Sequence, residues 1–248
     1  MKKLLVLFVC VAGSLVARAQ TADEVIDEYF AHTGGKDKWM AIKSMKATGK
    51  AKVQGMELPL TVLQKAPNKM KATATFQGMS FIQPCFDGGT GWNTNQMTMK
   101  PEKMAAEDSE NMKDEAMLED PFLNYAAKGY KVELQGKETV EGTECHKMKL
   151  TRKPTMVDGK AEENVVYYFF SVADDVPIMS RTVAKKGPAK GATVETFMSD
   201  YQEVAGGIFM PFTVTTKANG KDMMSMVMDK YETNVAIDDA EFAYPDKK

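Results

Sequence analysis

The segment SMKATGKAKV, residues 44–53, marks the point at which the chain changes from a helical to a strand pattern. Small or apolar residues take every second position in it: Met45, Ala47, Gly49, Ala51 and Val53. Lysine or threonine fills the positions between them. A period of two is typical of a strand that buries one face and leaves the other in water. The segment therefore predicts a half-buried strand, and the residues on either side of it decide the fold.

Residues ahead of this strand have helical spacing. Thr21 and Glu24 fit a capping box, in which each side chain accepts a hydrogen bond from the backbone of the other residue. The apolar stripe that follows consists of Val25, Ile26, Tyr29 and Phe30. Gly34-Gly35 supplies the left-handed backbone that ends a helix. We expect one helix here and a second, shorter one through residues 39–42.

Alternating runs continue downstream and are separated by turn signals such as Asn219-Gly220. The clearest of these runs are residues 58–63, 69–77, 130–134, 143–152, 165–172, 176–185, 193–204, 208–218 and 222–231. Because short connections join antiparallel neighbours, the pattern predicts a meander of about 10–12 strands. A sheet of this size curls, and helical segments must fill its concave face. The predicted fold class is α+β, mostly antiparallel β, with an unclosed half-barrel plugged by helices.

The first nineteen residues have the form of a secretory signal. Two lysines precede an apolar run at residues 4–15, and Ala17-Arg18-Ala19 provides a cleavage site of the A-x-A type. The run is too short to span a bilayer. We therefore expect residues 1–19 to be removed on export. No linker-like segment divides the remainder, so residues 20–248 are expected to form a single domain.

Composition and motifs exclude several classes of function. A nucleic-acid partner has no electrostatic support, because 34 acidic side chains outnumber 32 basic ones. The two histidines, His32 and His146, belong to no recognisable nucleophile, phosphate-loop or zinc motif. We expect no enzymatic activity and no cofactor. The two cysteines beyond residue 19, Cys85 and Cys145, leave open either one disulfide or two buried thiols.

The chain contains 20 methionines, which could favour either of two ligands. Copper prefers thioether and thiolate groups, and Cys145 lies next to His146. Adjacent residues of a strand point to opposite faces, so this pair is poorly placed to hold one ion. Copper binding is therefore the less favoured hypothesis. Apolar ligands are the stronger expectation, because flexible methionines adapt to ligands of variable shape. In the alternative reading, the methionines only fill an irregular core.

Two sets of apolar residues form the candidate site. The expected lining of the concave face is Leu58, Leu60, Val62, Met70, Phe76, Met224, Met226 and Met228. The expected lid is Met104, Met112, Met117 and Leu118. These lid residues belong to the acidic segment 97–118, which Pro101 is expected to begin as a helix. A loosely amphipathic helix over an apolar face suits a lid that opens.

Several short motifs together resemble those of a known family. They are Gly34-Gly35, Ala41-Ile42-Lys43-Ser44, Gly55-Met56-x-x-Pro59, Lys65-x-Pro67-Asn68-Lys69, Asp87-Gly88-x-x-Gly91-Trp92, Ser199-Asp200-Tyr201-x-Glu203-Val204 and Met210-Pro211. Through them the chain resembles the LolA/LolB-like outer-membrane lipoprotein-sorting proteins of Bacteroidetes-type bacteria. The resemblance implies an unclosed antiparallel barrel whose apolar cavity receives the acyl chains of lipoproteins or related lipids. It also implies a location in the periplasm of a Gram-negative envelope, with donor and acceptor proteins in the membranes as partners.

Carriers of this family close their lid with an arginine. Beyond residue 19 this chain has only Arg152 and Arg181, and both are expected on strands rather than beside a helix. The expected function is a periplasmic carrier that binds acyl chains for delivery to the outer membrane. The alternative is a structural protein, or an envelope-stress sensor or interaction protein, built on the same scaffold with a filled core.

Overall fold

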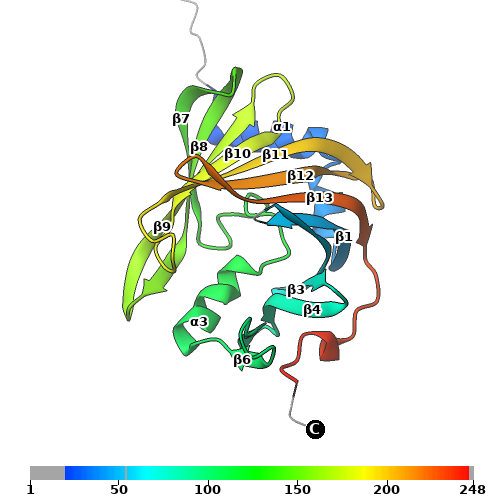
Figure 1. Cartoon of the computed structure of the whole chain (residues 1–248). Coiled ribbons are helices and arrows are strands. Elements are labelled where there is room, and N and C mark those ends of the chain that lie inside the picture. The colour runs from blue at the N-terminus through cyan, green and yellow to red at the C-terminus, as the bar shows by residue number, and fades with distance from the viewer. Residues whose placement is uncertain (1–19, 54, 246–248) are drawn as a thin grey trace, which may run out of the picture.

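The computed structural model of the chain describes residues 20–53 and 55–245, so the expected signal segment 1–19 lies outside the described residues. Thirteen antiparallel strands form one sheet within this part of the chain (Figure 1). The strands are β1 (Ser44–Val53), β2 (Met56–Lys65), β3 (Lys69–Phe76), β4 (Met79–Phe86), β5 (Gly91–Thr94), β6 (Pro101–Lys103), β7 (Lys131–Val140), β8 (Thr143–Val157), β9 (Lys160–Ser171), β10 (Pro177–Val183), β11 (Thr193–Val204), β12 (Ile208–Ala218) and β13 (Lys221–Thr233). The helices are α1 (Ala22–His32), α2 (Lys36–Met40), α3 (Ala106–Glu115) and the short 3-10 helix η1 (Asp239–Glu241).

The order of the strands explains why the barrel does not close. The sheet runs β6-β5-β4-β3-β2-β1-β13-β12-β11-β10-β9-β8-β7, so pairing of β1 with β13 joins two meanders. Strands β6 and β7 are left at the two edges. The sheet curls around α3 without the edges meeting (Figure 1). The predicted fold class is confirmed. The number of strands exceeds the expected one because β5 and β6 are too short for a period of two to be recognised.

Helix α1 covers one part of the concave face, and its N-terminus has the predicted capping box. The Glu24 N–H donates to the Thr21 hydroxyl at 3.2 Å, and the Thr21 N–H donates to the Glu24 carboxylate at 2.8 Å. The predicted stripe is buried against β8, β9 and the segment before β7. This cluster contains Val25, Ile26, Tyr29, Phe30, Phe122, Leu123, Tyr130, Met148, Leu150 and Phe170. Burial of this stripe therefore fixes α1 on the sheet.

The middle segment departs from the sequence prediction in two ways. Residues 101–103 form strand β6, paired with β5, and the helix begins only at Ala106. Pro101 lies at an edge of the sheet, where its missing N–H removes no ladder hydrogen bond. A helix start at Pro101 is therefore wrong. Met97 and Met99 precede the helix and are exposed to solvent, at 95% and 38% of their surface.

The C-terminal segment covers the outer face of β2–β5. Phe242 is fully buried beside Cys85 and Trp92, and the Phe242 carbonyl accepts a hydrogen bond from the Trp92 indole at 3.1 Å. Cys145 belongs to a different cluster on the outer face of β8–β11. Both cysteines are buried free thiols, which settles the alternative that the sequence left open.

Candidate functional site

Strand β2 carries an apolar row along the concave face of the sheet. Alternate residues of the strand share this face: Met56, Leu58, Leu60, Val62 and Gln64. The pairing of strands extends the row sideways, because Leu58 is opposite Ala51 of β1, and Ala51 is opposite Met226 of β13. In the same way Leu60 shares a face with Ala74 of β3. The result is a continuous apolar surface across four neighbouring strands.

The structure places all eight predicted lining residues on this surface. Its members are Leu58, Leu60, Val62, Met70, Phe76, Met224, Met226 and Met228. Only Leu60 and Met228 are buried, whereas the other six keep part of their surface open to solvent. We call this set the concave apolar face. Its partial exposure leaves apolar surface available for contact with another molecule.

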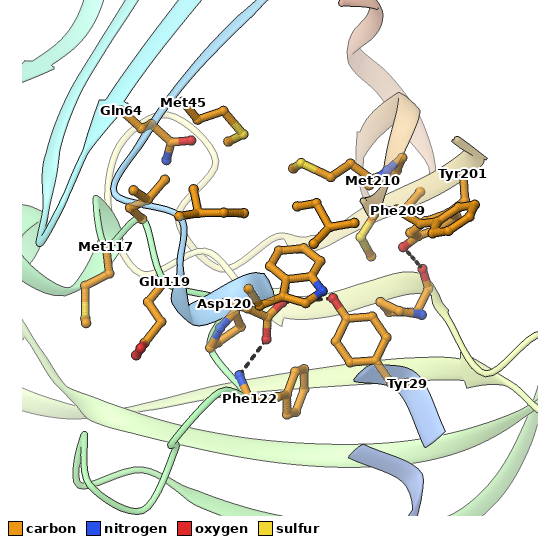
Figure 2. Close-up of a pocket in the computed structure, with 18 of the residues that line it drawn as sticks. Tyr29, Met45, Gln64, Met117, Glu119, Asp120, Phe122, Tyr201, Phe209 and Met210 are labelled. Atoms are coloured by element: carbon orange, nitrogen blue, oxygen red, sulfur yellow. Dashed lines mark hydrogen bonds between the residues drawn. The ribbon is translucent and has the colours of Figure 1, made fainter. Parts of the chain in front are cut away.

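A cavity of about 290 Å³ lies at the end of the sheet that α1 and α2 cover (Figure 2). None of the eight predicted lining residues contributes to its wall. Gln64 does, so the apolar row of β2 ends at this cavity. The wall is formed by Tyr29, Trp39, Ile42, Met45, Gln64, Met117, Leu118, Glu119, Asp120, Pro121, Phe122, Tyr168, Pro177, Met198, Tyr201, Ile208, Phe209, Met210 and Pro211. The concave apolar face therefore leads to a pocket that the sequence did not reveal.

Asp120 introduces a carboxyl group into this mostly apolar wall. Figure 2 shows it between the side chain of Tyr29 and the backbone of Phe122. It accepts hydrogen bonds from the Tyr29 hydroxyl at 3.0 Å and from the Phe122 N–H at 2.8 Å. Burial nevertheless raises the pKa of Asp120. Burial and the neighbouring carboxylate together raise the pKa of Tyr29 well above its ordinary value. No local pattern in the sequence indicated that Asp120 lies in a cavity.

Two other polar side chains of the wall, Tyr201 and Glu119, have partners within the protein. The Tyr201 hydroxyl donates to the Pro177 carbonyl at 2.7 Å. Glu119 forms an ion pair with Lys128 at 2.7 Å, and the Lys128 side chain is only 8% exposed. The cavity thus offers apolar contacts, with its carboxylates already paired or hydrogen-bonded.

Helix α3 closes the side of the curled sheet, and apolar contacts hold it to β3–β5. Met112 and Ala116 are buried against Phe86, and Met70 and Met104 pack beside them. The helix thus rests on one wall of the half-barrel through non-directional packing.

Polar contacts hold the opposite side of α3 to β8 and to Tyr130, the residue that precedes β7. The Asn111 side chain donates to the Met156 carbonyl at 2.9 Å and accepts from the Met156 N–H at 2.7 Å. Asp114 forms an ion pair with Arg152 at 3.0 Å, with the two side chains 14% and 18% exposed. The Tyr130 hydroxyl also donates to Asp114. Both arginines lie on strands as expected, Arg152 on β8 and Arg181 on β10. The expectation that neither lies beside a helix is wrong for Arg152, because its side chain pairs with Asp114 of α3.

A second polar contact holds the N-terminal end of α3. Lys186, in the connection between β10 and β11, pairs with Glu107 at 2.6 Å and also with Asp108. Glu107 accepts two backbone hydrogen bonds from the turn between β8 and β9. These partners lower the pKa of Glu107. Both ends of the helix are therefore fastened to the β8–β10 wall by charge.

The predicted lid residues divide between two places. Met117 and Leu118 follow α3 and line the 290 Å³ cavity. Met104 and Met112 pack on β3–β5, and they line a separate hollow of about 370 Å³ between α3 and β9–β10. The four residues thus lie on or beside one helix, but they do not face a common space.

Metal-binding groups do not gather in the described residues. No three His, Cys, Asp or Glu side chains within residues 20–53 and 55–245 come close enough to hold an ion. His146 is buried, and burial lowers its pKa. His32 pairs with Asp175 at 2.7 Å. In the same part of the chain, no helix is long and apolar enough to cross a membrane.

Comparison with known proteins identifies the fold. No protein-family model matches the chain, and no curated protein matches its sequence. A DUF1329 family protein from Desulfovibrio piger aligns over 90% of this chain and 97% of its own, with a TM-score of 0.57 and 12% identity. A domain named for outer-membrane lipoprotein sorting, from Vibrio parahaemolyticus, aligns over 88% of this chain and 94% of its own, with a TM-score of 0.53 and 13% identity. A LolA superfamily protein from Nitrosomonas europaea aligns over 91% of this chain and 98% of its own, with a TM-score of 0.52 and 10% identity. The fold expected from the resemblance is confirmed.

Proposed function

We propose that this protein is a non-enzymatic carrier in a Gram-negative envelope, and that it binds an acyl chain of a lipoprotein or related lipid on its concave apolar face. One observation carries the proposal: a row of half-buried apolar side chains leads along β2 to an apolar cavity under α1 and α2. A protein with a purely structural role would be expected to fill such a face with its own side chains. The shared fold with LolA-type proteins is consistent with the proposal.

Apolar contact alone could supply the affinity of such a carrier. Each buried methylene contributes about 0.8 kcal/mol, so a chain of about ten methylenes gains on the order of 8 kcal/mol before the entropic cost of binding is counted. A gain of that size corresponds to a dissociation constant in the micromolar range, and the entropic cost makes binding weaker still. Affinity of this strength allows release as well as capture. Few polar contacts to the ligand are needed.

The proposal is tested by two substitutions on adjacent residues of β13. Met226 belongs to the concave apolar face, whereas Val227 is 49% exposed on the opposite face. Met226→Asp places a charge where the acyl chain would lie, so we expect the affinity for a fluorescent fatty acid to fall at least tenfold. Val227→Asp adds the same charge outside and should leave the affinity unchanged. Thermal unfolding of both variants checks that the difference does not come from lost folding.

The wild-type protein provides the decisive outcome. Organic extraction followed by mass spectrometry of protein purified from its native envelope should release a lipid. A wild-type protein that yields no lipid and takes up no fatty-acid probe would overturn the proposal and favour the structural or sensor role. Equal loss of probe binding in the Met226→Asp and Val227→Asp proteins would place the ligand elsewhere.

A further inference from the structure

Exposed methionines gather at one end of the sheet. Antiparallel order places six turns at this end, those between β1 and β2, β3 and β4, β5 and β6, β8 and β9, β10 and β11, and β12 and β13. Five methionines lie in or beside these turns and are 38–95% exposed: Met56, Met79, Met97, Met99 and Met223. We call them the methionine rim. The described residues include eight exposed large apolar side chains, so most of these side chains lie on the rim.

Three of the rim residues occupy consecutive hairpins. Met79 follows the β3–β4 turn, Met56 follows the β1–β2 turn, and Met223 follows the β12–β13 turn. These hairpins are neighbours in the sheet, so their tips are spaced by roughly 10 Å, which is two strand separations. Each side chain is about half exposed, at 47%, 46% and 51%. Turns usually carry polar residues, and packing within this protein does not account for three large apolar side chains at the tips.

Basic residues accompany the rim. The turns at this end with their flanks, residues 50–53, 55–57, 75–81, 95–103, 157–160, 183–193 and 218–223, contain nine lysines and four carboxylates. The turns at the other end, residues 66–69, 87–90, 138–144, 172–176 and 203–208, contain one lysine and seven carboxylates. Four of the nine lysines form ion pairs within the protein: Lys50, Lys185, Lys186 and Lys190. The other five form no ion pair within the described residues: Lys52, Lys100, Lys103, Lys160 and Lys221. The remaining excess of positive charge lies at the rim of a chain whose formal charge is −2.

The rim is continuous with the proposed ligand site. Met56 begins the apolar row of β2, which continues through Leu58 and Leu60 toward the cavity. On the neighbouring strands, Phe76 and Met224 of the concave apolar face lie close to the same turns. An apolar surface that contacts the rim would therefore meet the concave apolar face directly.

We propose that the methionine rim docks this protein on an anionic phospholipid bilayer. The methionines enter the interface between headgroups and acyl chains, and the lysines contact the anionic headgroups. The inference extends the proposed function, since it identifies a membrane surface as the place where the ligand enters or leaves. It is tested without ligand, so its failure is distinguishable from failure of the carrier role.

Vesicle sedimentation tests the docking surface. The wild type should sediment with vesicles rich in phosphatidylglycerol, bind pure phosphatidylcholine vesicles weakly, and dissociate at high salt. The triple variant Met56→Ser/Met79→Ser/Met223→Ser should bind at least tenfold more weakly. Met40→Ser is the matched control, because Met40 is 39% exposed on α2, away from the rim. Lys52→Gln/Lys100→Gln/Lys221→Gln should weaken binding by about fivefold per lysine and reduce its salt dependence.

A fluorescent label then locates the contact. Cys85 and Cys145 are buried, so a dye directed to thiols should label the introduced residue in Met79→Cys or Met40→Cys. Vesicles should shift the emission of the dye to shorter wavelength at position 79 and leave it unchanged at position 40. No binding to anionic vesicles, or an equal shift at the two positions, would overturn the proposal. If the wild type fails to bind vesicles yet still takes up a fatty-acid probe, docking fails while the carrier role stands.

Discussion

Removal of Arg152 should release α3 from the β8 wall without unfolding the sheet. Arg152 is the partner of Asp114 in a largely buried ion pair, and its guanidinium also lies 5.6 Å from the centre of the Tyr130 ring. Arg152→Met keeps much of the apolar stem that packs there and removes the charge. Asp114 then keeps the Tyr130 hydroxyl as a donor, but it loses its cationic partner.

The size of the effect follows from the burial of the pair. Loss of one partner from a buried ion pair costs about 3–5 kcal/mol, because the other charge stays desolvated. Asp114 and Arg152 are 14% and 18% exposed, so we take the lower end of that range. The cost falls on the contact between α3 and β8, so it shifts the equilibrium between docked and released α3. A shift of about 3 kcal/mol raises the population of molecules with α3 released by about 100-fold.

Amide hydrogen exchange measures that population directly. Exchange of residues 106–115 in Arg152→Met should accelerate by about 100-fold, while exchange in β12 and β13 should change little. Adding Asp114→Asn should restore part of the protection, because the unpaired charge is then removed.

Arg181→Met is the matched control for this experiment. Arg181 forms ion pairs with Glu138 and Glu195 on the outer face of the sheet, remote from α3. It is the other arginine of the described residues. Equal acceleration of exchange in α3 for the two variants, or no acceleration in Arg152→Met, would refute the role given to Arg152.

Three further predictions concern the sheet, the C-terminal segment and the cavity. Gly49→Ala should lower the free energy of unfolding by about 1–3 kcal/mol in urea, because the added Cβ would lie 2.3 Å from a backbone oxygen of β13. Phe242→Ala should cost about 3–5 kcal/mol. It should also expose Cys85, whose pKa burial raises to about 12, to a thiol reagent that Cys145 still resists. Burial raises the pKa of Asp120, so its charge disfavours folding, and Asp120→Asn should gain stability over the wild type in thermal unfolding as pH rises above about 4.

The sequence was most informative where structure depends on a local period. Alternation grouped Leu58 with Leu60 on β2 and Met226 with Met228 on β13, and the register shows that both groups lie on the same face of the sheet. The capping box at Thr21 was equally easy to predict, because its two hydrogen bonds join residues that are three positions apart in the sequence. Such features need only neighbouring residues to be recognised.

Features that depend on distant segments were missed or misread. The pair between Asp114 and Arg152 joins residues on a helix and a strand, and no spacing along the chain indicates that they meet. The cavity has the same character, since Tyr29 and Asp120 come from segments 91 residues apart. Pro101 was misread for another reason. Proline suits the first turn of a helix and an edge strand alike, and only the pairing with β5 decides between them.

The two sides of α3 suggest how the half-barrel could open. Packing of Met112 and Ala116 on Phe86 is apolar and tolerates small rotations, whereas the ion pair at Arg152 and the contacts of Glu107 depend on short distances and fixed directions. A rotation of α3 about its apolar side would therefore break the polar contacts first. It would separate the helix from β8–β10, at the hollow that Met112 shares with β9 and β10. Opening on that side leaves the concave apolar face intact on β1–β3 and β13, so access to the site would not require the sheet to unfold.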